Sequence, residues 1–139
     1  KGMEDLIAAL SHLRGIEGCT GKTGTVSYCL DGLLAYLMAC QSDAECNVSY
    51  NGVGLDEKLN LASNITAPTL LHMAEEDEYV NKKAQAAINN GLAGHSSVTL
   101  YSYAGVNHAF TRNDGIHYDA DTTTLAHQRT ADAFAAALH

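Results

Sequence analysis

Stretches with strand character alternate with stretches of helical periodicity along this chain, and that alternation restricts the fold more than any other feature. The β-branched and aromatic runs predict four short strands, at residues 25–29, 47–54, 67–74 and 97–105. Apolar residues at helical spacing predict four helices, at residues 3–14, 31–41, 81–92 and 121–138. Such an order is typical of an α/β fold, here with about four parallel strands and flanking helices.

Two of the predicted helices have apolar residues at helical spacing. In the first, Leu6, Ile7, Leu10 and Leu13 fall on one face. In the last, Leu125 and Phe134 are expected to face inward, together with Leu138 at its end.

Length and composition favour one domain over residues 1–139, with 46% hydrophobic and 17% charged residues and no low-complexity linker. The formal net charge of −8 argues against a nucleic-acid binder and against docking on an anionic membrane. No apolar run is long enough to cross a bilayer and no secretory signal is visible, so we expect a cytoplasmic protein.

The cysteine pattern gives little sign of a metal site. Cys19, Cys29, Cys40 and Cys46 include no C-x-x-C pair, so a structural zinc site is not expected. A short loop could bridge Cys40 to Cys46, but without a secretory signal reduced thiols are the better expectation.

Three reactive side chains follow three of the predicted strands. Cys29 comes after the first strand, Asp77 after the third and His108 after the fourth. Right-handed crossovers bring the carboxyl ends of all these strands to one rim of the sheet. The order nucleophile, acid, histidine is also that of the α/β-hydrolase triad.

These residue types suit nucleophilic hydrolysis. A thiol attacks an ester carbonyl as the thiolate, a histidine takes its proton, and a carboxylate holds the imidazole in the right tautomer. Other interpretations remain open from the residues alone. Cys29 could be an inert buried thiol, His108 could cap a loop, and Asp77 could be a solvated acid within the acidic run 75–78.

Three motifs bear on this choice. The sequence "SYCLDG", residues 27–32, is similar to a G-x-C-x-G-G elbow, residues 75–80 form an "EEDxxV" loop, and residues 108–110 read "HAF". With the final segment 118–134, these motifs resemble the dienelactone hydrolase family, and the likeness runs through nearly the whole chain.

The resemblance implies hydrolysis of an ester or lactone, of the carboxymethylenebutenolidase type, without a cofactor. It implies Cys29 as nucleophile, His108 as general base and then acid, and Asp77 as the residue that orients it. It also implies the backbone N–H of Leu30 as an oxyanion donor and Arg112 as the group that binds a substrate carboxylate. Arg112 could equally be a surface residue of its "TRNDG" loop.

The elbow departs from the family pattern at Ser27 and Asp31, where glycines are usual. Serine should fit the tight turn. A carboxylate at Asp31 is expected to raise the pKa of the neighbouring thiol and so to work against the thiolate.

The chain resembles roughly the carboxy-terminal half of the family. The amino-terminal strands, the second oxyanion donor, a glutamate near the thiol and another substrate arginine have no counterpart in it. The first strand is then expected to be an unpaired edge, and we expect a homodimer through residues 24–29.

Three other kinds of function compete with this one. A half-fold that keeps the triad residues could be a binding or assembly module. A metal site built from His72, Glu75 and Glu76, or from the thiols, is disfavoured because no ligand spacing resembles H-E-x-x-H. A serine hydrolase is disfavoured because no G-x-S-x-G occurs.

Overall fold

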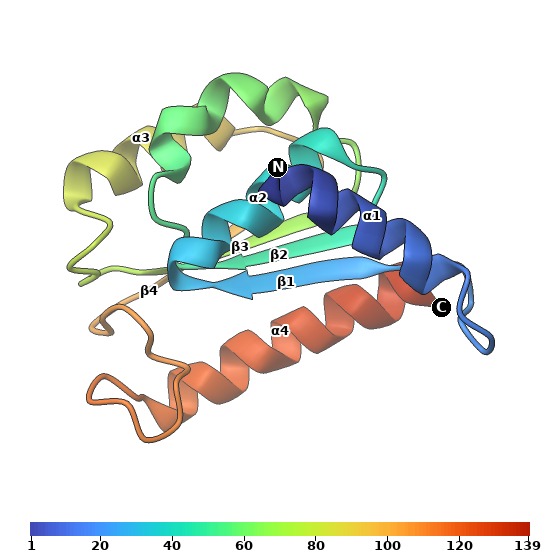
Figure 1. Ribbon diagram of the computed structural model, residues 1–139. Coiled ribbons are helices and arrows are strands. Elements are labelled where there is room, and N and C mark those ends of the chain that lie inside the picture. The colour runs from blue at the N-terminus through green and yellow to red at the C-terminus, as the bar shows by residue number, and fades with distance from the viewer.

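A four-stranded sheet lies between two layers of helices in the computed structural model, which describes residues 1–139 (Figure 1). All neighbouring strands are parallel, and their order in the sheet follows the chain. The strands are β1 (Gly24–Tyr28), β2 (Cys46–Tyr50), β3 (Thr69–Ala74) and β4 (Val98–Tyr103). The predicted α/β architecture with four parallel strands is therefore confirmed.

The helices divide unequally between the two faces of the sheet. They are α1 (Gly2–Arg14), α2 (Gly32–Gln41), α3 (Lys82–Leu92) and α4 (Ala120–Leu138). Figure 1 shows α1, α2 and α3 on one side of the sheet and α4 crossing the other. All four helices lie within one or two residues of the predicted ranges.

Two 3₁₀ segments were not predicted, η1 (Cys29–Asp31) and η2 (Leu55–Asn64). The second follows β2, which ends earlier than predicted because Asn51 adopts a positive φ of 49° and turns the chain out of the sheet. Leu55, Leu59 and Ala62 fall at helical spacing within η2, so the sequence did carry a signal for it.

Each face of the sheet carries its own apolar cluster. The cluster beneath α2 and α3 includes Tyr36, Leu71 and Ile88. The cluster beneath α4 includes Tyr50 and Phe110, both fully buried. Strands β2 and β3 are buried along their whole length, as expected for the central strands of a sheet covered on both faces.

The inward face of α4 differs from the prediction at one position. Leu125 is 45% exposed, whereas Thr123 and Ala126 are buried and Phe134 packs against the cluster beneath α4. At 3.6 residues per turn, Leu125 and Phe134 fall on opposite sides of a helix, so both cannot face the sheet. The prediction for Leu125 was wrong.

The first strand is an edge of this sheet. It pairs only with β2, and Val26 and Tyr28 are 42% and 44% exposed.

All four cysteines are free thiols. None of the helices combines the length and the apolar character that spanning a membrane requires.

Candidate active site

Cys29 lies on a strained turn between β1 and α2. Its φ is +60°, a left-handed conformation that few residues other than glycine adopt. The Ser27 hydroxyl braces this turn, because it donates to the carbonyl of Asp31 and accepts from the backbone N–H of Ala35 at 3.1 Å. Serine thus fits the elbow, as expected, and contributes hydrogen bonds that a glycine there could not.

Gly32 allows α2 to begin directly against the end of β2. A Cβ atom at this position would lie 2.6 Å from the carbonyl oxygen of Tyr50 and 2.9 Å from the Cα of Gly52. Only glycine permits this approach, because the atoms in the way belong to the backbone. The close contact holds the elbow against the loop after β2.

Asp77 and His108 form a buried pair at the carboxyl end of the sheet. Nδ1 of His108 lies 2.9 Å from Oδ2 and 3.0 Å from Oδ1 of Asp77. Because the carboxylate only accepts, Nδ1 carries the proton and Nε2 is left as the basic nitrogen. Both residues are buried, so His108 does not simply cap an exposed loop.

The Asp77 carboxylate is held in turn by the backbone. Its Oδ1 accepts from the N–H of Tyr79 at 2.8 Å and of Val80 at 3.2 Å. Within the acidic run Glu75–Glu78, Asp77 alone is buried, so it is not one of the solvated acids.

An open cavity of about 700 Å³ brings together four of the five predicted site residues, namely Cys29, Leu30, His108 and Arg112. Asp77 is the fifth, and it contacts the imidazole of His108. The other lining residues are Tyr28, Tyr50, Asn51, Val53, Tyr79, Ala109, Thr111 and His127. None is a carboxylate, although the chain has 16 acidic residues. Arg112 therefore lines this cavity, and it is also exposed to solvent.

The surroundings of Cys29 disfavour its thiolate form. Burial raises the pKa of Cys29 above its ordinary value, the charge of Asp77 raises it further, and Arg112 opposes them. Asp31 also raises this pKa, as expected, but its effect is the smallest of the four. A nucleophilic role for this thiol would therefore require a base to take its proton.

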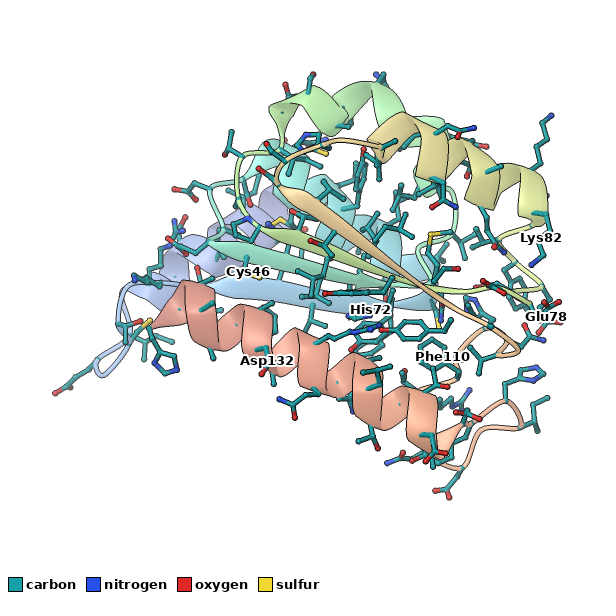
Figure 2. The ribbon with its side chains drawn as sticks, turned by 180° about the vertical axis from the view of Figure 1, so that it is seen from behind. Cys46, His72, Glu78, Lys82, Phe110 and Asp132 are labelled. Carbon is teal, nitrogen blue, oxygen red and sulfur yellow. The ribbon has the colours of Figure 1, made fainter.

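A row of aromatic rings, which we call the aromatic row, runs across the sheet beside the cavity. Tyr28, Tyr50, His72 and Tyr101 are register partners on successive strands. Their ring centroids are 4.6, 4.2 and 5.6 Å apart, and the Arg129 guanidinium lies 4.0 Å from the centroid of Tyr101. Figure 2 shows His72 between the sheet and α4.

His72 is fully buried within this row and cannot serve as the metal ligand considered above. Its Nδ1 lies 2.8 Å from the Tyr103 hydroxyl and its Nε2 lies 3.0 Å from the Thr130 hydroxyl, so both ring nitrogens are engaged. Burial lowers the pKa of His72 to about 3, which keeps the ring neutral at neutral pH. No group of three His, Cys, Asp or Glu side chains is close enough to hold a metal ion.

Several cavity residues were missed from the sequence, above all Tyr28, Tyr50, Tyr79 and His127. The first two carried a usable signal, since each is the last residue of its strand and so belongs to the same rim as Cys29. Tyr79 and His127 carried no such signal, because the loop after β3 brings Tyr79 to the cavity and α4 brings His127.

The sequence and the fold of this chain are both similar to those of known proteins. A model of the dienelactone hydrolase family matches residues 1–138. The carboxymethylenebutenolidase 1 of Cupriavidus pinatubonensis is 34% identical over 134 residues, which are 96% of this chain and 57% of that relative. A carboxymethylenebutenolidase of Pseudomonas putida is 33% identical over 134 residues, with the same two shares.

The fold is shared with solved structures of lower identity. The dienelactone hydrolase-like promiscuous phosphotriesterase P91, from metagenomic libraries, superposes with a TM-score of 0.81 at 20% identity. That match covers 95% of this chain and 59% of P91. The chain thus spans little more than half the length of the relatives it matches. Because the family model covers nearly every residue, the chain belongs to the dienelactone hydrolase family.

Proposed function

We propose that this chain hydrolyses an ester or lactone bond with Cys29 as nucleophile, His108 as base and Asp77 as the residue that orients the base. The observation that carries the proposal is the buried Asp77–His108 pair, which opens onto the same cavity as a cysteine on a strained elbow. The relatives named carboxymethylenebutenolidases support the same class of reaction.

The reaction would proceed in two stages. Nε2 of His108 takes the thiol proton while Sγ of Cys29 bonds to the carbonyl carbon, and the backbone N–H of Leu30 donates to the oxyanion. The carbon–oxygen bond then breaks, and the leaving oxygen takes the proton from His108. Water, activated by His108, finally splits the thioester to give the acid and the free thiol. Every group is a side chain or a backbone amide, so no cofactor is required.

The cavity favours an anionic, unsaturated substrate. Arg112 can pair with a carboxylate through two hydrogen bonds, and no acidic side chain lines the cavity to repel one. The rings of Tyr28 and Tyr79 offer apolar surface to a conjugated group. A dienelactone has both features, and we propose it as the substrate class.

We further propose that the chain acts in the cytoplasm as a homodimer joined through β1. Four free thiols suit a reducing compartment. The edge of β1 is unpaired, and a groove of about 360 Å³ runs beside it, lined by apolar residues of α1 and α2 such as Leu6, Leu13 and Leu34. Pairing with a second copy would cover both the edge and the groove. The net charge of −8 disfavours a nucleic acid as a partner, and a small molecule remains the proposed partner of the site.

The dimer can be tested by sedimentation at micromolar concentration. We expect a dimer for the wild type and a monomer for Val26→Lys, because a charge on an exposed edge strand opposes pairing. Asp132→Lys, a charge change on α4, serves as the control and should remain dimeric. A wild type that sediments as a monomer at this concentration would rule the dimer out.

A binding or assembly module is the second candidate function. The raised pKa of the Cys29 thiol and the exposed edge of β1 favour it, since the first weakens a nucleophile and the second offers a docking surface. Turnover distinguishes the two candidates.

The deciding experiment is hydrolysis of a dienelactone and of an activated aryl ester by wild type and by Cys29→Ala. We expect wild-type turnover and a loss of at least about 10³-fold in Cys29→Ala, because the covalent route disappears. Cys19→Ala removes an exposed thiol elsewhere and should keep wild-type activity. Equal rates for wild type and Cys29→Ala would refute a cysteine hydrolase and favour the binding module.

A further inference from the structure

The loops after β3 and β4 remain hydrogen-bonded to each other beyond the ends of the two strands. The N–H of Glu75 donates to the carbonyl of Tyr103 at 2.9 Å, and the N–H of Glu76 donates to the carbonyl of Val106 at 3.0 Å. These two bonds extend the pairing of β3 with β4 toward the loops that hold Asp77 and His108. Figure 2 shows Glu78 at this end of the sheet and Cys46 at the other end.

The next connection between the loops is made by a side chain. Oδ1 of Asn107 accepts from the backbone N–H of Glu78 at 3.1 Å and from the N–H of His108 at 2.6 Å. One of these amides belongs to the residue after Asp77, and the other belongs to His108 itself. A single oxygen therefore joins the two loops immediately beside the Asp77–His108 pair.

We propose that Asn107 is a positioning residue, which sets the distance between the Asp77 carboxylate and the His108 imidazole by bridging their two loops. The proposal rests on the proposed function for its catalytic consequence. Asp77 is already fixed within its own loop by the amides of Tyr79 and Val80. The bridge from Asn107 instead fixes that loop relative to the one that carries the base.

The chemistry of an amide suits this position. An asparagine oxygen accepts two hydrogen bonds without adding a charge beside the histidine. An aspartate would keep the acceptor and hence the bridge, but it would add a negative charge beside the imidazole, which favours the imidazolium form. The two substitutions Asn107→Ala and Asn107→Asp thus separate loss of the bridge from addition of a charge.

Ester hydrolysis as a function of pH tests the proposal. We expect Asn107→Ala to lower kcat about 10- to 100-fold with KM changed less than about twofold, because the base is misplaced while the cavity is kept. Asn107→Asp should stay within about threefold of wild type at its own optimum, with the acidic limb of its profile moved to higher pH.

The matched control is His95→Ala. The His95 side chain also bridges two segments, since Nδ1 accepts from the N–H of Ser97 at 3.2 Å and Nε2 lies 2.9 Å from the carbonyl of Ala62, but it does so before β4 begins. The His95→Ala substitution should lower the free energy of unfolding without lowering kcat. The inference is overturned if Asn107→Ala keeps kcat within twofold of wild type, if His95→Ala lowers kcat equally, or if Asn107→Asp is as impaired as Asn107→Ala.

Hydrogen exchange measured by NMR separates this inference from the proposed function. In Asn107→Ala the amides of Glu78 and His108 should exchange about 10-fold faster than in wild type, while those of β2 keep their rates. A wild type without turnover would refute the proposed function and leave the bridge to be decided by these rates. Unchanged exchange at both amides would overturn the bridge.

Discussion

Replacing Asp77 with asparagine is expected to lower kcat about 10³- to 10⁴-fold while the chain stays folded. The amide oxygen of the new side chain would take the place of Oδ1, where it accepts from the N–H groups of Tyr79 and Val80. Its NH₂ group would then face Nδ1 of His108 in place of Oδ2. Because an NH₂ group only donates, Nδ1 would have to accept, and the imidazole proton would move to Nε2. A protonated Nε2 cannot take the thiol proton of Cys29.

The measurement is kcat for an activated ester, with circular dichroism as a check that the fold is kept. Glu76→Gln is the matched control, since Glu76 is an exposed acid of the same loop that pairs with Lys82 at 3.6 Å. It should change kcat by less than about twofold, as expected for a surface ion pair. If Asp77→Asn retained a tenth or more of wild-type activity, His108 would not depend on Asp77 for its tautomer, and the proposed roles would be wrong.

Gly32→Ala is expected to lower the free energy of unfolding by about 3 kcal/mol, because the added methyl group overpacks a contact between backbones. The φ of Gly32 is −55°, so the new residue would have no backbone strain of its own. The cost comes from the carbonyl oxygen of Tyr50 and the Cα of Gly52, which lie within 3 Å of the new Cβ and cannot rotate away. The elbow and the loop after β2 would have to separate.

Gly91→Ala is the control for this prediction. Gly91 also lies in a helix, but a Cβ there would meet the end of the Leu59 side chain, which can change rotamer. The gain in helix propensity, about 1 kcal/mol, offsets much of that contact. Urea denaturation of the two variants compares them directly. A Gly32→Ala protein as stable as Gly91→Ala would show that α2 can move away from β2 at little cost.

The position of Asp31 explains how the elbow tolerates a carboxylate. Its side chain is exposed to water, and its effect on the pKa of Cys29 is smaller than that of burial or of Asp77. The sequence-based concern has the right sign, but the solvent around Asp31 screens its charge. Arg112, across the same cavity, acts in the opposite direction.

Much of the fold follows from local sequence patterns. The four strands, the four helices and the elbow at Cys29 could be predicted because each depends on a short period or a turn within about ten residues. The common rim of Cys29, Asp77 and His108 also follows, because right-handed crossovers place the ends of parallel strands together whatever the details of packing. The motifs that resemble the dienelactone hydrolase family lie in these same segments.

Only the tertiary structure decided which groups meet across distant segments. Tyr79 and His127 reach the cavity from a loop and from α4, His72 becomes the centre of the aromatic row, and Asn107 bridges two loops. Leu125 is exposed to solvent because only one side of α4 packs against the sheet, and Thr123 and Ala126 lie on that side. Side-chain period and turn chemistry are local properties and can be read along the chain. The partners of a buried or bridging side chain depend on how separate elements pack, which no local pattern specifies.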